Sequence, residues 1–513
     1  MSEKVTLSVN GHEVRVAAGA NLIDALEAVG IDIPHFCYHP ALGADGNCRM
    51  CLVEIEDGRP PIVPACKTPA AEGMKVVLES EKIKKIQRDI LEMELINHPV
   101  DCPVCDQAGE CTLQDYYMKF DLGDSRMDVA QVKKDKRLDF GGGVVHDQER
   151  CVLCGRCVRF TRQITKTGEL GIVNRADQAR VAIFPGKPLN NRYALNVVEL
   201  CPVGAMTSRD FRFKQRVWFL KKTPGVCHGC ATGCSITIDH HREKYKDARI
   251  YRYRARHNPL INGYFICDDG RLSYHLENEN RLETPLVKGV PVTPTEALDA
   301  VRTHLGQAKY PLVVVSPDCS LEQLYAAQMF CLEHGAKVSG YSAAAIVAGD
   351  GDDYLIKDDK AANRPSLNLL GIDTSREYLR EALGHADLVI TLNNDPFTDG
   401  ADADLSEMMK GITTIACATH HCEFFDNADI VLPIASYSEY AGSVINSDGV
   451  LQRFGRAVVK NRPVPELLEL LHALGGPVAD MGAAWAGMRT AVAPLGAVDP
   501  DKIGEHGMRL EGL

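Results

Sequence analysis

The sequence predicts a multidomain protein, with cysteine-rich α+β domains in its first half and a parallel α/β domain in its second. Three observations support this prediction. The 513 residues exceed the usual size of a single domain. Fifteen of the 19 cysteines fall between residues 37 and 267. Beyond about residue 288, apolar strand-like segments alternate with helical ones, which is typical of a parallel sheet covered by helices.

The chain begins with segments that predict a small mixed sheet around one helix. Val5–Val9, an Asn10-Gly11 turn and His12–Val16 predict a hairpin. Asn21 is expected to cap a short helix that ends before Gly30. Further strands are expected at 52–56, 62–66 and 75–78. A mixed sheet that holds one helix is the β-grasp arrangement.

The loops of this first domain contain four cysteines spaced C-x10-C-x2-C-x14-C, called here the first group. Its members are Cys37, Cys48, Cys51 and Cys66. Four thiolates on β-grasp loops suit a [2Fe–2S] cluster, and the Gly43–Gly46 turn would direct backbone amides toward it. The alternative is a set of four buried structural thiols.

A charged helix, Glu81–Asn97, is expected to lead into the second group, spaced H-x3-C-x2-C-x5-C. Its members are His98, Cys102, Cys105 and Cys111. One imidazole and three thiols suit either an iron–sulfur cluster or a zinc ion. The flanking cysteine groups favour iron–sulfur. A further helix is expected from Thr112 to Lys119.

The third group combines a C-x2-C-x2-C run with a distant Cys-Pro. Its members are Cys151, Cys154, Cys157 and Cys201. This is the bacterial ferredoxin pattern for [4Fe–4S], and because no second run lies near Cys201, we expect that residue to complete the same cluster. Four arginines surround the run, namely Arg150, Arg156, Arg159 and Arg162. They either offset the negative charge of the cluster or form a solvated basic face.

The fourth group is spaced C-x2-C-x3-C with a distant cysteine, again a [4Fe–4S] pattern. Its members are Cys227, Cys230, Cys234 and Cys267. Ser235–Asp239 and Gly263–Cys267 are expected to be short strands. His228 lies between ligands, but the cysteine pattern needs no nitrogen, so we expect a non-ligand role for it.

The second half predicts an α/β layer. Pro311–Ser316, Ala386–Leu392 and Ile412–Cys417 predict buried strands, and Leu321–His334 predicts a helix that ends at Gly335. Turns after such strands could hold a nucleotide or pterin phosphate. Neither a G-x-G-x-x-G nor a Walker pattern is present, however. Beyond residue 463 the chain is rich in Ala, Gly and Pro, which predicts little order.

Composition restricts the environment and the partners. A formal charge of −12 argues against a nucleic-acid-binding surface. Close C-x2-C pairs in a chain of this size indicate metal ligands in a reducing compartment. The N-terminus has no signal-peptide pattern, and no apolar run is long enough to cross a bilayer. We therefore expect a soluble chain that reaches any membrane through partners.

These motifs together resemble one family, the large iron–sulfur subunit of respiratory complex I, the NADH:quinone oxidoreductase. The resemblance is specific over residues 1–280. It continues more loosely to about 460, through Ala428–Pro433 and Glu439–Asn446, which are similar to the molybdopterin-oxidoreductase-like domain of that subunit. The implied domains are a β-grasp [2Fe–2S] domain (1–79), a His-ligated [4Fe–4S] domain (80–145), a ferredoxin-like [4Fe–4S] domain (146–219), a [4Fe–4S] domain of molybdopterin-oxidoreductase type (220–285) and a reduced α/β scaffold (286–513).

The resemblance also implies the cofactors. The first group matches the binuclear cluster of the family, the second its His-ligated tetranuclear cluster, and the third the tetranuclear cluster that continues the main electron path. The fourth group matches a cluster that only some members have, although the spacing before Cys267 is slightly long. One [2Fe–2S] and three [4Fe–4S] clusters are expected, with no molybdenum and no catalytic residue. The short molybdopterin-like region weakens any case for pterin binding.

The implied function is electron transfer. Electrons would pass singly from a partner subunit that binds NADH and FMN, through the clusters, toward a partner that holds the quinone site. The chain would act with the other peripheral-arm subunits at the cytoplasmic face of the bacterial inner membrane. The rival is a molybdoenzyme such as an NAD-dependent formate dehydrogenase. Against it, only one ferredoxin cluster is present, and Cys319 is the only early cysteine offered as a molybdenum ligand.

Overall fold

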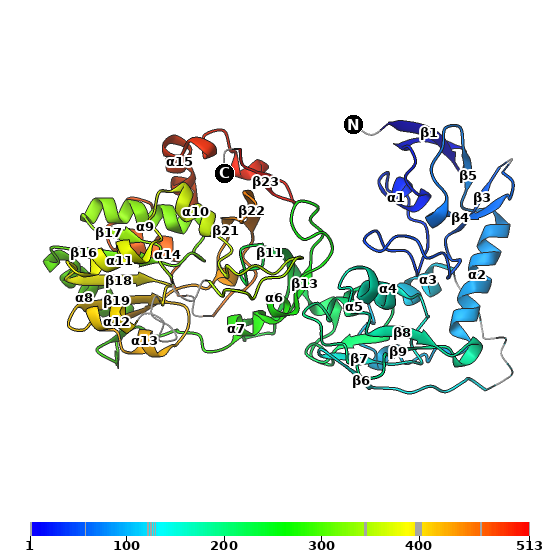
Figure 1. Cartoon of the computed structure of the whole chain (residues 1–513), viewed down its shortest axis with the longest axis horizontal. Coiled ribbons are helices and arrows are strands. Elements are labelled where there is room, and N and C mark those ends of the chain that lie inside the picture. The colour runs from blue at the N-terminus through cyan, green and yellow to red at the C-terminus, as the bar shows by residue number, and fades with distance from the viewer. Residues whose placement is uncertain are drawn as a thin grey trace. The chain divides into compact units, whose positions relative to one another are not determined.

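The computed structural model describes residues 3–56, 58–120, 123, 126, 128, 130–342, 346–395, 403–461 and 464–511. The chain forms two compact units, Met1–Phe219 and Leu220–Leu513 (Figure 1). Within the described ranges, none of the helices has the length and apolar character needed to cross a membrane.

The first unit opens with a five-stranded mixed sheet in the order β2-β1-β5-β3-β4. Its strands are β1 (Lys4–Val9), β2 (His12–Ala17), β3 (Leu52–Ile55), β4 (Ile62–Pro64) and β5 (Lys75–Val77). β1 runs parallel to β5, and the other neighbours are antiparallel. Helix α1 (Leu22–Glu27) buries its apolar face against this sheet, and Asn21 caps it by accepting a hydrogen bond from the Asp24 amide. The β-grasp prediction is confirmed.

The rest of the first unit joins helices and short sheets through one core. The elements are α2 (Glu81–Leu95), α3 (Thr112–Phe120), β6 (Leu138–Gly141), β7 (Val144–His146), α4 (Arg156–Gln163), β8 (Leu170–Val173), β9 (Arg180–Ile183), α5 (Asn196–Leu200) and β10 (Met206–Ser208). Strands β10, β7 and β6 form one sheet, and β8 pairs with β9. Phe36 and Met50 from the β-grasp loops share a buried cluster with Leu91, Leu113 and Val203. This core holds the loops of the first three cysteine groups together.

The second unit begins with an antiparallel sheet of β11 (Lys221–Val226), β12 (Ser235–Arg242) and β13 (Ala248–Ala255), followed by α6 (Asp268–Leu272) and α7 (Tyr274–Asn278). The strand predicted at Gly263–Cys267 is wrong, since the segment forms only one bridge, between Asn258 and Gly263. The buried Asn262 side chain explains the difference. It accepts from the Ser235 amide and donates to the Phe265 carbonyl, which satisfies backbone groups without a ladder.

A seven-stranded sheet in the order β15-β14-β20-β19-β18-β16-β17 forms the centre of the second unit. Its strands are β14 (Leu286–Val287), β15 (Val290–Pro291), β16 (Pro311–Val315), β17 (Lys337–Ser339), β18 (Leu388–Leu392), β19 (Thr413–Ala418) and β20 (Ile430–Pro433). Five neighbouring strands, β17, β16, β18, β19 and β20, are parallel. Strand β14 is antiparallel to both of its neighbours, β15 and β20. The predicted parallel α/β layer is confirmed.

Helices cover both faces of this sheet (Figure 1). They are α8 (Pro294–Gln307), α9 (Leu321–His334), α10 (Arg364–Leu369), α11 (Arg376–Leu383), α12 (Ala403–Met408) and α13 (Glu423–Asp426). Val313 and Val315 of β16 face the core that contains Phe330 of α9, while Leu312 and Val314 face a second core with Leu379 of α11. Alternate residues are thus buried on opposite faces, which explains the uninterrupted apolar run of β16.

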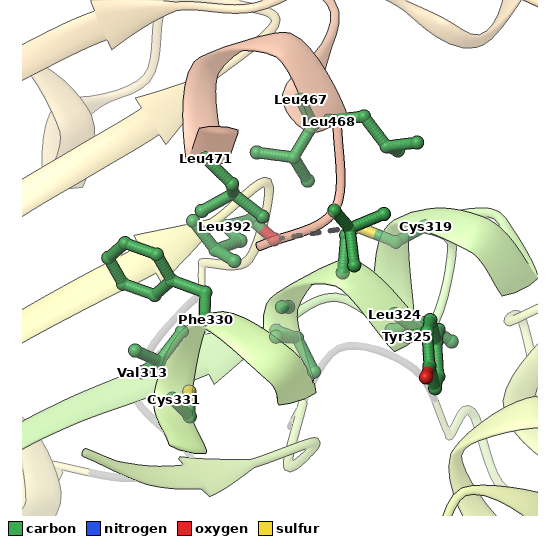
Figure 2. Close-up of a cluster of buried hydrophobic side chains, with 14 of the residues drawn as sticks. Val313, Cys319, Leu324, Tyr325, Phe330, Cys331, Leu392, Leu467, Leu468 and Leu471 are labelled. Carbon is green, nitrogen blue, oxygen red and sulfur yellow. Dashed lines mark hydrogen bonds between the residues drawn. The ribbon is translucent and has the colours of Figure 1, made fainter. Parts of the chain in front are cut away.

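The C-terminal segment is ordered, contrary to prediction. It contributes α14 (Leu467–Ala473), α15 (Met481–Ala491) and β23 (Met508–Arg509), which pairs with β22 (Val450–Phe454) beside β21 (Gly442–Ile445). Figure 2 shows Leu467 and Leu471 among the buried side chains around Phe330. The Trp485 indole donates to the buried Glu322 carboxylate at 2.9 Å. Apolar burial of these few side chains outweighs the Ala- and Gly-rich composition around them.

We predict that Leu471→Ala destabilises the second unit by about 2–5 kcal/mol, because it removes a buried side chain from a close-packed core. The matched control is Leu332→Ala on α9, whose side chain is 72% exposed and whose loss should change the free energy of unfolding by less than about 0.5 kcal/mol. Urea denaturation followed by circular dichroism measures both. Equal midpoints for the two variants would show that α14 does not contribute to this core.

Candidate metal centres

The first group lies in the β-grasp loops, with Cys37, Cys51 and Cys66 buried and Cys48 half-buried. The Cys37 amide donates to the Cys48 sulfur at 3.5 Å. Hydrogen bonds from the Cys48 thiol and from the backbone amides of residues 46–48 lower the pKa of the Cys37 thiol. Cys51 and Cys66 form a second hydrogen-bonded pair of thiols. The loop therefore gathers four sulfurs and supplies amide donors to them.

The amide donors of the first group depend on the turn at Gly46, which has a φ of +80°. That left-handed conformation favours glycine. A Cβ at this position would also come within 2.8 Å of the Lys67 side chain. The end of the Lys67 side chain is flexible and can move away, so the left-handed backbone is what explains the glycine.

The second group follows α2 and ends where α3 begins. His98, Cys102 and Cys111 line a cavity of about 920 Å³ flanked by these helices. Burial lowers the pKa of His98 to about 4, so the imidazole is neutral at pH 7 and has a lone pair available to a metal. Burial raises the pKa of Cys111 to about 11, and the amides of residues 113 and 114 oppose this rise.

Cys105 is not among the described residues that line this cavity. Its sulfur lies beside Gly204 instead, 2.2 Å from the position that a Cβ on Gly204 would occupy. Since Gly204 is three residues after Cys201, the second and third groups approach each other here. Three of the four predicted ligands of the second group thus share a cavity, and the fourth faces the third group.

The third group surrounds a small cavity that all four of its cysteines line. Cys157 lies on α4, and Cys201 follows directly after α5. The N-cap of α4 is Gly155, in the left-handed conformation with φ +72°. Burial raises the pKa of Cys201, while the amides of residues 203, 205 and 206 oppose this rise. The structure therefore brings the distant Cys201 to the C-x2-C-x2-C run.

The fourth group lies between β11, β12 and α6. The Gly229 amide donates to the Cys227 sulfur at 3.4 Å, and the Gly270 amide donates to the Cys267 sulfur at 3.3 Å. A Cβ on Gly270 would come within 2.8 Å of the Cys227 sulfur and 3.3 Å of the Cys267 sulfur. Gly270 thus lets the distant Cys267 approach Cys227 closely.

His228 is turned toward aromatic neighbours. Its ring lies 4.1 Å from that of Tyr437 and 5.8 Å from that of Phe454, measured between centroids. Burial lowers the pKa of His228 to about 4.

The chemistry of the four donor sets fits iron–sulfur clusters. All 19 cysteines are free, so no disulfide competes for these sulfurs. Each group combines several buried or half-buried sulfurs with backbone N–H donors or close glycines. Such donors stabilise anionic sulfur and tune iron–sulfur clusters.

Arginines connect the loops of the first three groups, with Arg150 buried and Arg156 and Arg159 half-buried. Arg156 donates to the carbonyls of Tyr38 and Leu200, at 2.5 and 3.3 Å. Arg159, one turn later on α4, donates to the carbonyls of Cys37, Leu42 and Gly43. The two arginines therefore hold the first-group loop against the third-group helix.

Arg150 makes a corresponding connection between the second and third groups. It precedes Cys151 and forms two hydrogen bonds with the Asp101 carboxylate, at 2.7 and 3.2 Å. Asp101 precedes Cys102. Asp147 adds a third contact at 3.4 Å. In the first unit the third group is thus linked on one side to the first group and on the other to the second.

Sequence reasoning left the role of these arginines open and did not identify Asp101 or Gly204. The spacing of Arg156 and Arg159 at i and i+3 placed both on one helix face, but nothing local indicated the carbonyls they reach. Arg162, by contrast, is exposed.

The second unit contains a cavity of about 460 Å³ beyond the carboxyl ends of the parallel strands. Its walls include the aromatic rings of Tyr253 and Tyr437 and three carboxylates, from Glu277, Asp318 and Asp395. Burial raises the pKa of Asp318 to about 7. None of the described lining residues is a lysine or an arginine.

Cys319 also lines this cavity but behaves as a buried thiol. It donates to the Leu392 carbonyl at 3.7 Å, as Figure 2 shows. Burial raises its pKa to about 12, the same direction as for Cys111 and Cys201.

Four known families match parts of the chain. The matches are to the 2Fe-2S iron–sulfur cluster binding domain (residues 2–81), the NADH-ubiquinone oxidoreductase-G iron–sulfur binding region (87–126), the ferredoxin-like domain of NADH-quinone oxidoreductase subunit 3 (141–207) and the molybdopterin oxidoreductase family (360–462). Domains that bind 2Fe-2S and 4Fe-4S clusters are therefore present, and the multidomain fold class is confirmed.

Curated relatives agree with these matches. The NADH-quinone oxidoreductase G subunit of Streptomyces coelicolor is 37% identical over 64% of this chain and 39% of its own length. The mitochondrial NADH dehydrogenase [ubiquinone] iron-sulfur protein 1 of Solanum tuberosum is 38% identical over 56% of this chain and 38% of its own length. The NADPH-Fe(3+) oxidoreductase subunit alpha of Geobacter sulfurreducens is 30% identical over 93% of this chain and 52% of its own length.

The chain spans about half, or less, of the length of these relatives. The names of these relatives and the three iron–sulfur family matches agree with the resemblance to the large iron–sulfur subunit of NADH:quinone oxidoreductase, which the cysteine motifs indicated. The chain is therefore similar to the large iron–sulfur subunits of NADH-quinone oxidoreductase and to the 75 kDa subunit of NADH-ubiquinone oxidoreductase.

Proposed function

We propose that the chain is an electron-transfer subunit of an NADH:quinone oxidoreductase. Single electrons would enter from a partner subunit that binds NADH and FMN and leave toward a partner that holds the quinone site. The observation that carries this proposal is the succession of three sulfur-rich groups in the first unit. Arg156 and Arg159 connect the first group to the third. Arg150 and Gly204 lie between the third group and the second.

The proposed ligands are the four predicted groups. The first would hold a [2Fe–2S] cluster, and the second, third and fourth would each hold a [4Fe–4S] cluster. Their residues are Cys37, Cys48, Cys51, Cys66; His98, Cys102, Cys105, Cys111; Cys151, Cys154, Cys157, Cys201; and Cys227, Cys230, Cys234, Cys267. A cavity lined by all four residues supports the third set, and one lined by three of the four supports the second. Amide donors and close glycines support the first and fourth.

Bound clusters supply reversible one-electron transfer. The residues of the chain bury the sulfurs, exclude water and fix the separation between groups. We propose the order first, third and then second group, or its reverse, because the third group contacts both others. No general acid, nucleophile or hydride acceptor is needed in this chain, which we regard as having no substrate site of its own.

We propose five domains, with boundaries at 79/80, 145/146, 219/220 and 285/286. The two compact units divide at 219/220. The three iron–sulfur family matches lie largely within the first, second and third of these domains. The last domain would act as a scaffold for other peripheral-arm subunits. The assembly would lie at the cytoplasmic face of the bacterial inner membrane.

We propose that the α/β domain holds no molybdenum cofactor, which also disfavours a formate dehydrogenase. A pterin dinucleotide carries phosphates, and the carboxylates of Glu277 and Asp395 in the walls of the 460 Å³ cavity would repel them, as would Asp318 when it is ionised. No described lysine or arginine in the walls offsets that repulsion.

The relative in Geobacter favours a second candidate. It matches 93% of this chain, including the α/β domain, whereas the two NADH dehydrogenase relatives described above match 56–64%. That protein is named for NADPH and Fe(3+) rather than for quinone. The second candidate is therefore an electron-transfer subunit of an NADPH-dependent oxidoreductase that reduces acceptors other than quinone.

We predict about 14 irons and no molybdenum per chain in the anaerobically purified protein, as one binuclear and three tetranuclear clusters require. Metal analysis of one digest measures both elements. About ten irons would mean that one tetranuclear site is empty. Stoichiometric molybdenum would contradict the proposal and favour a molybdoenzyme.

Cys201→Ala should remove about four irons and one tetranuclear signal in electron paramagnetic resonance, because the third group loses a ligand. The matched control is Cys331→Ala, which removes a buried thiol outside all four groups. Iron content and spin quantitation measure both variants. Unchanged iron in Cys201→Ala would remove this cysteine from the ligand set.

The native complex, purified through a tag on this chain, should reduce a quinone with NADH and lose that activity in Cys201→Ala. Spectrophotometric assays with NADH or NADPH, and with quinone or Fe(3+), distinguish the two candidates. A complex that reduces Fe(3+) with NADPH but leaves quinone unreduced would establish the second candidate over the first.

A further inference from the structure

We propose that Arg156 is a counter-charge shared by the first and third groups and raises the reduction potentials of the clusters at both. The inference rests on the proposed cluster ligands. Arg156 donates to the carbonyl of Tyr38, which follows Cys37, and to the carbonyl of Leu200, which precedes Cys201. One guanidinium therefore lies directly beside a ligand of each group.

Neither Arg156 nor Arg159 forms an ion pair with a carboxylate in the described part of the chain. Arg150 differs, because Asp101 and Asp147 surround it at 2.7 and 3.4 Å. The Nε atoms of Arg156 and Arg159 are buried and have no hydrogen-bond partner among the described residues. Both side chains are half-buried, and a cation partly removed from water is stabilised by a negative charge nearby.

The sulfurs of the two groups are the anions within reach. Burial lowers the pKa of Arg156, while the Cys154, Cys201 and Cys37 sulfurs oppose that shift. Arg156 in turn favours the thiolate forms of Cys154 and Cys201. Clusters held by four thiolates carry net negative charge, which would complete the electrostatic balance that the described protein atoms leave open.

A fixed positive charge affects reduction directly. Each cluster gains one electron on reduction, and no bond forms or breaks in the protein. The added negative charge is stabilised by a nearby guanidinium that is less screened than it would be in water. Loss of Arg156 should therefore make both clusters harder to reduce.

The test compares Arg156→Met, Arg156→Lys and Arg162→Met in the full chain, purified anaerobically. Redox titration monitored by electron paramagnetic resonance separates the binuclear from the tetranuclear signals by their temperature dependence. Arg156→Met should lower the equilibrium constant for reduction at both clusters by about tenfold, or about 59 mV for a one-electron couple. Arg156→Lys should keep both potentials, and Arg162→Met, at an exposed position on the same helix, should leave them unchanged.

A purely structural role gives a different result. If Arg156 only fastens two loops, Arg156→Met lowers thermal stability while both potentials stay in place, and the inference is overturned. If Arg156→Met does not retain its iron, the two cluster potentials measured in Arg156→Lys test the inference instead. A tenfold fall at both clusters despite the retained charge overturns the inference, and unchanged potentials with weakened loop contacts support it.

The failure of this inference is distinguishable from failure of the proposed function. An unmodified protein without binuclear or tetranuclear signals would contradict the ligand sets themselves. Signals that are present but insensitive to Arg156→Met would overturn only the shared counter-charge.

Discussion

Burial of sulfur is the constraint on which the cysteine-rich part of the structure depends. A thiolate removed from water needs donors or cations close to it. The first group receives amides from residues 46–48, the third from residues 203–206, and the fourth from Gly229 and Gly270. Loops that direct so many N–H groups inward cannot be regular strands or helices. The irregular backbone and its left-handed glycines follow from that electrostatic requirement.

Most local elements were predictable because their signals lie within a few residues. Asn21 caps α1, and α9 spans Leu321–His334 and ends at Gly335, as predicted. Cysteine spacing indicated the four groups for the same reason. Contacts between distant segments were not predictable. Arg156 reaches a carbonyl 118 residues away, and no local pattern encodes that partner.

The second unit shows why a fold alone does not identify a ligand. Its parallel sheet places a cavity beyond the strand ends, where α/β proteins commonly bind ligands. The walls of this cavity are acidic and aromatic, so the same architecture offers a surface unsuited to phosphates. Cys319 remains a neutral thiol bonded to the Leu392 carbonyl. A family match to the fold therefore says little about what this cavity holds.

Gly204 binds nothing, yet it controls how closely two groups approach. A single methyl group at this position would come within 2.2 Å of the Cys105 sulfur, and the loops would have to separate. Electron tunnelling falls exponentially with distance, so a small displacement there would slow transfer much more than it would disturb the fold. In the proposed electron path, the hydrogen atom that glycine carries in place of a side chain thus keeps the second and third groups close together.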